Sequence, residues 1–72
     1  METRLLTATL ARADHVCSFC IRPLADGWEV SKREDDRVVQ EQCYSDWHRV
    51  ERTLTRFNGE IAALREQGWL DA

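Results

Sequence analysis

The residues of this 72-residue chain that could do chemistry are three cysteines and a histidine. Cys17 and Cys20 are separated by two residues, and His48 follows Cys43 by five residues. A Cys-x2-Cys pair can direct two sulfur atoms at one metal ion, and a further cysteine with a histidine completes a tetrahedral set of zinc ligands. The spacing therefore predicts one structural zinc ion per chain, bound by Cys17, Cys20, Cys43 and His48.

The fourth zinc ligand has three candidates. His48 is the first choice because neutral imidazole binds zinc well, although residues five apart on an ideal helix diverge. Asp46, three residues after Cys43, fits the helix geometry better, but its carboxylate is a harder ligand. His15 is the third candidate. The residue pattern leaves these alternatives open.

The cysteines have two further interpretations. Free cysteine is often buried, so the three thiols could be small core side chains. Cys17 and Cys20 could instead form a redox pair, but no βαβ pattern surrounds them. We favour zinc because a domain of this length buries only about 60% of its unfolded surface and usually needs a staple.

The elements that must position these residues begin with a predicted short helix over residues 1–13, where Leu5, Leu6 and Leu10 recur at near-helical spacing. Residues 17–43 are predicted to form a zinc knuckle followed by a β-hairpin. The hairpin is indicated by Trp28 and Val30, which alternate with polar residues before the polar turn "REDD", and by Val38 and Val39 after it. The chain shows no repeat and no linker, so residues 1–72 are predicted to form a single domain.

A long amphipathic helix is predicted over residues 45–67. Ser45 or Asp46 can cap its start, and Gly68 can end it in a left-handed conformation. Its apolar residues step by three and four, as in a heptad stripe: Trp47, Val50, Leu54, Phe57, Ile61 and Leu64. The stripe could pack on the N-terminal helix or on a second copy of the chain. A length of about 34 Å favours the dimer or a bound partner, because it exceeds what so small a domain covers easily.

The succession of a Cys-x2-Cys knuckle, a hairpin and a helix resembles a treble-clef zinc finger. Within that group, "CSFCIRPL" and "VVQEQCYSDW" are similar to LIM-type fingers over residues 17–48. The chain departs from that pattern at Gln40, where such fingers usually carry a histidine. The resemblance implies a small α+β fold in which a zinc-stapled β-hairpin lies between a short N-terminal helix and a long C-terminal amphipathic helix.

Composition excludes several classes of protein. The net charge of -3 gives no overall attraction to nucleic acid, and no stretch approaches the roughly 18 apolar residues that cross a bilayer. The N-terminus lacks the pattern of a secretory signal, so we expect a cytoplasmic protein without a membrane partner. No glycine-rich phosphate loop or paired catalytic carboxylates are evident, so we do not expect an enzyme.

These features predict an adaptor or regulator that binds another protein through its long helix and hairpin, with transcription as one setting. Trp69 and Leu70 follow the helix and would be exposed, and exposed apolar pairs often mark a partner contact.

The alternative function is nucleic-acid binding. Arg49, Arg52 and Arg56 share one face of the long helix, and such a face can bind phosphates. A simpler interpretation is a solvated face on which these arginines pair with nearby carboxylates, those of Glu51, Glu60 and Glu66.

Overall fold

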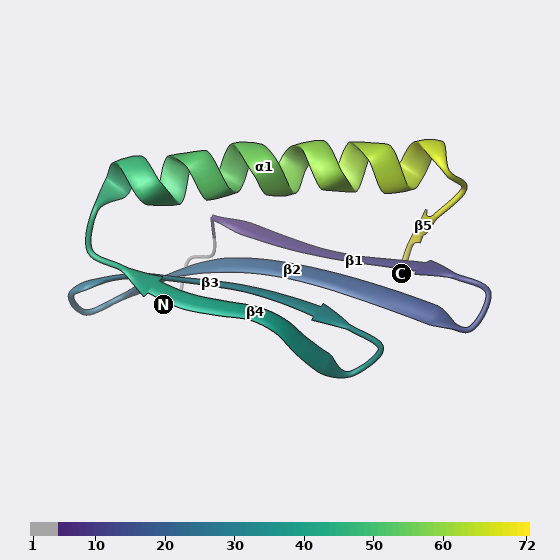
Figure 1. Cartoon of the computed structure of the whole chain (residues 1–72), viewed down its shortest axis with the longest axis horizontal. Coiled ribbons are helices and arrows are strands. Elements are labelled where there is room, and N and C mark those ends of the chain that lie inside the picture. The colour runs from purple at the N-terminus through teal and green to yellow at the C-terminus, as the bar shows by residue number, and fades with distance from the viewer. Residues whose placement is uncertain (1–4) are drawn as a thin grey trace.

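Four consecutive strands form an antiparallel meander, and a single helix returns along one face of the sheet (Figure 1). The computed structural model describes residues 5–72. The sheet order is β4-β3-β2-β1-β5, so the short last strand adds to the outer edge of β1. The elements are β1 Leu6–Arg12, β2 His15–Leu24, β3 Gly27–Glu34, β4 Arg37–Tyr44, α1 Trp47–Glu66 and β5 Leu70–Asp71.

The strands are joined by tight turns that the sequence supports locally. Between β3 and β4, Asp35 and Asp36 have φ angles of 51° and 68°. A two-residue hairpin loop with both residues left-handed matches the twist of the flanking strands, and aspartate tolerates this conformation better than most residues. The polar turn expected within "REDD" is therefore the tip of the β3–β4 hairpin.

The side chains of Asp35 and His15 tie this hairpin tip to the start of β2. Asp35 Oδ1 accepts a hydrogen bond from Val16 N at 2.9 Å, and Asp35 Oδ2 lies 3.0 Å from His15 Nδ1. The hydrogen bond with Asp35 and then its negative charge raise the pKa of His15. The hydrogen bonds from His15 and Val16 lower the pKa of Asp35.

This pair predicts a defined pH dependence. A raised histidine pKa stabilises the fold below the ordinary histidine pKa and loses that effect as pH rises through the folded-state value. A lowered aspartate pKa stabilises the fold above the ordinary aspartate pKa and loses that effect as pH falls. Both contributions to stability are present between roughly pH 4 and 6.5.

An NMR titration tests whether Asp35 raises the pKa of His15. Asp35→Asn should lower the pKa of His15, whereas Asp36→Asn in the same turn should leave it raised. Equal effects of the two changes would contradict the assignment.

The core lies between the sheet and α1. Successive residues of a strand point to opposite faces, so Cys17, Phe19 and Ile21 of β2 face the helix while the residues between them face away. The rings of Phe19 and Phe57 meet edge to face with centroids 5.1 Å apart. The buried apolar residues are Leu10, Cys17, Phe19, Ile21, Val30, Val50, Phe57 and Ile61.

Helix α1 begins and ends with defined caps. The Asp46 side chain accepts a hydrogen bond from His48 N at 2.9 Å. At the other end, Gly68 has a φ of 94°, and Trp69 N donates to Leu64 O at 3.0 Å, which closes the last turn in a Schellman motif. The helix is continuous through Gly59, as the unbroken phase of the apolar stripe predicts.

The predicted N-terminal helix is wrong over the described part of the chain, because Leu6–Arg12 form β1. Leu6, Ala8 and Leu10 pack on the core, and the residues between them face the other side of the sheet. This is the period of two that a strand requires, and threonine favours strands. Residues 1–4 of the predicted helix lie outside the described residues.

The predicted zinc-stapled fold is also wrong. Instead of a knuckle, residues 15–24 form one continuous strand that pairs with β1 on one side and β3 on the other. The chain is a small α+β protein in which apolar packing between the sheet and α1 takes the place of a metal staple.

The heptad stripe packs within the chain. Val50, Phe57 and Ile61 are buried against the sheet, and Leu54 and Leu64 pack on the same core, whereas Trp47 is 40% exposed. The length of the helix does not require a dimer or a partner, because strands of eight to ten residues extend about 26–33 Å and match it. Across residues 5–72, the structure contains no helix with the length and apolar character needed to span a membrane.

Candidate binding surface

The residues predicted to bind zinc are dispersed over the fold. Cys17 is buried and faces α1, while Cys20, three residues along the same strand, faces the opposite side of the sheet. Cys43 is exposed on β4. Two cysteines on opposite faces of a strand cannot direct their sulfur atoms at one ion.

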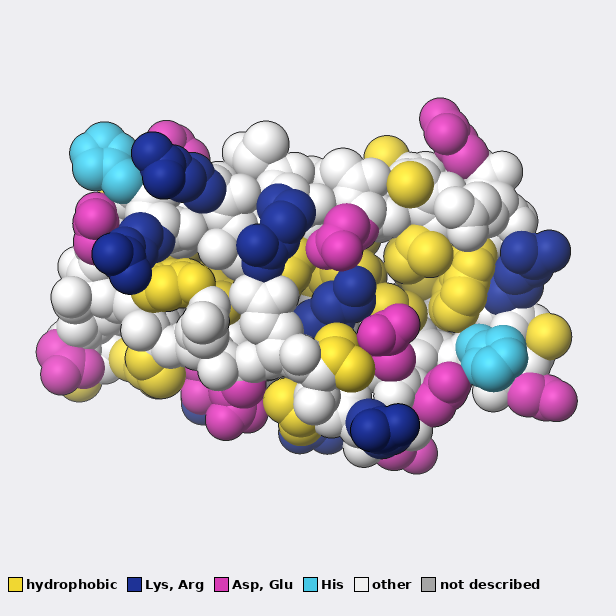
Figure 2. Space-filling view, in the orientation of Figure 1, with side chains coloured by type: hydrophobic (Ala, Val, Ile, Leu, Met, Phe, Trp, Pro, Cys, Tyr) yellow, Lys and Arg dark blue, Asp and Glu magenta, His cyan; other side chains and the backbone are white. Residues whose placement is uncertain are grey.

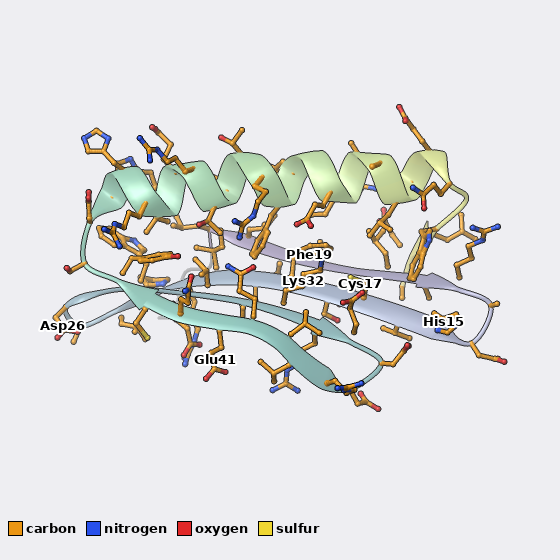
Figure 3. All side chains as sticks on the ribbon, viewed as in Figure 1. His15, Cys17, Phe19, Asp26, Lys32 and Glu41 are labelled. Atoms are coloured by element: carbon orange, nitrogen blue, oxygen red, sulfur yellow. The ribbon has the colours of Figure 1, made fainter. Side chains whose placement is uncertain are left out.

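The other predicted ligands lie elsewhere. The Asp46 carboxylate caps α1, and His48 is exposed on its first turn. His15 pairs with Asp35 at the opposite end of the sheet, below the C-terminal end of α1 (Figure 3). Between residues 5 and 72, no three or more His, Cys, Asp or Glu side chains are grouped so that they could hold a metal ion. The resemblance to treble-clef and LIM-type fingers is therefore wrong, and zinc binding stays a prediction without structural support.

Cys17 is not suited to act as a nucleophile either. Burial raises the pKa of the Cys17 thiol, and the positive charge of the nearby Lys32 ammonium opposes this rise without cancelling it. A thiol with a raised pKa stays protonated at neutral pH and is a poor nucleophile. All three cysteines are free.

The outer edge of β4 is the most evident interaction surface. This strand lies at the end of the sheet order, and α1 covers a face of the sheet, leaving that edge open (Figure 1). In residues 5–72, no further backbone hydrogen bond outside the ladder involves residues 37–44. Val38 and Val39 on this strand are 49% and 48% exposed.

A β-bulge shapes this edge. Arg33 pairs with Val38 and Lys32 pairs with Gln40, so Val39 is an extra residue on β4. A bulge bends its strand and increases the local twist. In Figure 1 the tip of the β3–β4 hairpin curves away from α1. The bulge thereby separates a bent first half of β4 from a regular second half, residues 40–44.

A row of arginines on α1 lies next to β4. Arg56 Nη2 donates to Gln40 Oε1 at 2.9 Å, which places this side of the helix over the edge strand. Arg49 and Arg52 share the same face of α1 and are exposed. Figure 2 shows basic side chains gathered over the N-terminal half of α1 on this side of the molecule.

These arginines are not neutralised by the carboxylates that the sequence suggested. Glu60 pairs with Lys32 of β3, with Nζ and Oε1 3.2 Å apart. Across the described residues, no ion pair includes Arg49 or Arg52. Their guanidinium groups therefore present positive charge beside the free edge of β4, although the chain as a whole is acidic.

The two residues after α1 have different environments. Trp69 is half-buried and packs on the core, so it is not the exposed contact that the sequence suggested. Leu70 is 73% exposed on β5, where it pairs with Ala11 of β1. Leu70 thus lies at the edge of the sheet opposite to β4.

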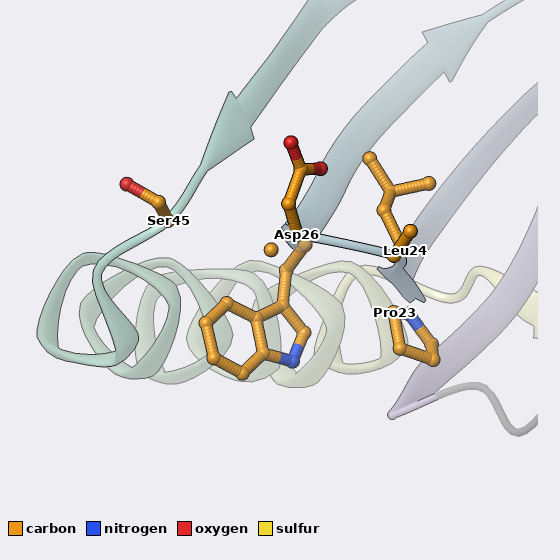
Figure 4. A pocket seen from close by; sticks show the side chains of 7 residues that line it. Pro23, Leu24, Asp26 and Ser45 are labelled. Carbon is orange, nitrogen blue, oxygen red and sulfur yellow. The ribbon is translucent and has the colours of Figure 1, made fainter.

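The surface of residues 5–72 is hollowed in several places. One hollow, about 300 Å³, is a broad depression at the β2–β3 turn between Leu24, Asp26, Trp28 and Ser45 (Figure 4). Another, about 210 Å³, lies under the C-terminal half of α1. Its walls come from the sheet and the helix, and the residues are Cys17, Lys32, Glu34, Glu60, Ala63, Leu64 and Trp69.

Comparison with known protein families, with curated proteins and with solved structures finds no significant match. The geometry of the edge strand, the arginine row and the surface hollows is therefore the basis for assigning a function.

Proposed function

We propose that this protein is an adaptor that binds an extended segment of a partner protein along the free edge of β4. The observation that carries the proposal is the position of β4 at the end of the sheet order, with two half-exposed valines. An edge strand presents unpaired backbone N–H and C=O groups, and an extended peptide can pair with them as one more strand.

The composition of β4 supports this role. Edge strands that must avoid pairing usually carry lysine, proline or a bulge. The half of β4 formed by residues 40–44 contains no lysine, proline or bulge, and its one charged residue is Glu41. Residues 40–44 therefore form a regular edge that is open to pairing.

The chemistry beside β4 specifies the partner. An added strand would direct alternate side chains toward α1, where Arg52 and Arg56 lie, and these positions favour acidic residues. The other side chains would lie on the open face of the sheet beside Glu41 and Cys43 and near Val38, where the Glu41 carboxylate disfavours acidic residues and Val38 favours apolar ones. The expected partner segment is extended and alternates acidic with apolar residues.

This specification can be tested with peptides selected from a random display library on the wild-type protein. We expect the selected sequences to alternate acidic and apolar residues. Arg52→Glu should weaken their binding about tenfold, because it places like charges beside the added strand. The control Arg12→Glu changes an exposed arginine on β1 by the same charge and should have little effect. Peptides without acidic residues, or equal losses in both variants, would contradict the proposal.

Nucleic-acid binding through Arg49, Arg52 and Arg56 is the second candidate. It is favoured because, across the described residues, neither Arg49 nor Arg52 forms an ion pair. Phosphate contacts release counterions, so such binding weakens steeply as salt increases. Retention of a short DNA or RNA strand at low salt, lost in Arg52→Glu and kept in Arg12→Glu, would favour this candidate. No retention at low salt would exclude it.

A further inference from the structure

We propose that the 210 Å³ pocket under the C-terminal half of α1 binds a small aromatic molecule that carries one primary amine. This site is distinct from the edge of β4, and the proposal does not depend on the adaptor function.

The size and lining of the pocket suit one aromatic ring. Leu64, Ala63 and Trp69 supply apolar surface, and Cys17 at the base is only 3% exposed. An apolar cavity of about 150 Å³ is large enough to hold benzene. The remaining volume accommodates a short arm with a polar end. The Cys17 thiol is neutral because burial raises its pKa, so the base of the pocket carries no charge.

The charges at the pocket favour a cation. Its lining contains one ammonium group, that of Lys32, and two carboxylates, those of Glu34 and Glu60. Lys32 is held in place by Glu60 Oε1 at 3.2 Å and by the Phe19 ring, whose centroid lies 5.4 Å from Nζ. The pocket therefore has an excess of one negative charge, which repels an anionic ligand and attracts an amine.

One atom supplies the specific contact. Glu60 Oε2 is buried and has no hydrogen-bond partner among residues 5–72. A buried carboxylate oxygen without a donor is unfavourable, and the Glu60 side chain, which is 38% exposed, can satisfy it by rotating this oxygen toward the ammonium N–H of a ligand in the pocket. The amine position thus follows from the oxygen that Lys32 leaves free.

The pocket is reachable because the β3–β4 hairpin bends away from the helix. Figure 3 shows Cys17 and Lys32 pointing from the sheet toward α1 on the side where the hairpin tip curves away. The bulge at Val39 is the structural cause of that bend.

The test is an NMR titration of the ¹⁵N-labelled protein with benzylamine, with benzyl alcohol as the neutral probe. For a ligand this small we expect a Kd on the order of 1 mM for benzylamine, with shifts at Lys32, Glu60 and Leu64. Benzyl alcohol should bind about tenfold more weakly. Glu60→Gln, which removes the charge at nearly constant shape, should abolish that preference.

A second pair of variants tests where benzylamine binds, without removing a charge from the protein. Ala63→Phe should fill the pocket and prevent benzylamine binding, whereas Ala62→Phe, at an exposed neighbour that does not line it, should leave binding intact. Both alanines are exposed on α1, and each variant spectrum shows directly whether the fold is kept. Equal affinity for the two probes, no saturable shifts, or binding that survives in Ala63→Phe would overturn the proposal.

Discussion

Phe57→Ala is expected to lower the free energy of unfolding by about 3–5 kcal/mol, the range for removing a large side chain from a core. Phe57 is fully buried on α1, and its ring contacts Phe19 at the centre of the sheet. A domain of 72 residues has a total stability of only about 4–11 kcal/mol. The single change should therefore remove roughly a quarter or more of the total stability.

Urea denaturation followed by tryptophan fluorescence and circular dichroism measures this effect. Thr55→Ala is the control, because it truncates an exposed side chain on the same helix and should change stability by less than about 0.5 kcal/mol. If Phe57→Ala lost no more stability than this control, the packing of α1 on the sheet would be refuted.

Gly27→Ala is expected to destabilise the protein by about 1–3 kcal/mol, as overpacking does. A methyl group at Gly27 would lie 2.3 Å from the carbonyl oxygen of Tyr44 and 3.1 Å from its carbonyl carbon. Both are backbone atoms, so no side chain can rotate to make room. The β2–β3 turn would have to move away from the end of β4, where the chain turns toward α1.

Gly59→Ala is the matched comparison and should have the opposite sign. A methyl group there meets no atom within 4 Å, and alanine is favoured over glycine in a helix by about 1 kcal/mol. The same urea experiment compares both variants with the wild-type protein. Equal destabilisation by the two changes would contradict the close approach at Gly27.

The elements with a strong local pattern could be predicted from the sequence. The stripe from Trp47 to Leu64 has a helical period, and the structure has α1 over Trp47–Glu66. The hairpin around Asp35 and Asp36 was predictable because apolar residues precede and follow a turn-forming polar run. Both signals depend on neighbouring residues and need no knowledge of the tertiary structure.

The first strand was not predictable in the same way. Leu10 follows Leu6 by four positions, a spacing that a helix and a strand both place on one face. Pairing with β2 decides between them, because it buries Leu10 and places Thr9 opposite Ser18. That pairing is a tertiary contact, and the short segment contains no signal for it.

The cysteine spacing was misleading for a related reason. In "VCSFCI", the inward side chains are Cys17, Phe19 and Ile21, which is the period of a buried strand. Cys20 lies between the inward-facing Phe19 and Ile21, so the alternation of the strand directs its side chain to the face away from α1. A Cys-x2-Cys pair fits a metal knuckle and a strand equally well when the flanking residues are apolar.

The candidate binding surface depends on strand order, which residue patterns do not encode. β4 is an edge strand because β5 adds to β1 at the other end of the sheet. The arginine row was visible in the sequence, but its position beside β4 follows from the contact of Arg56 with Gln40. The small pocket combines Lys32 of the hairpin with Glu60 of the helix, two residues that no local motif connects.

Amide hydrogen exchange of the wild-type protein, with and without a selected peptide, tests the adaptor proposal most directly. Strand addition should slow exchange at the outward-facing amides of residues 40–44, because their N–H groups gain hydrogen bonds to the peptide. The amides of β1 should exchange at unchanged rates. Peptide binding that leaves residues 40–44 unprotected, or that protects β1 and β5 instead, would show that the free edge of β4 is not the binding site.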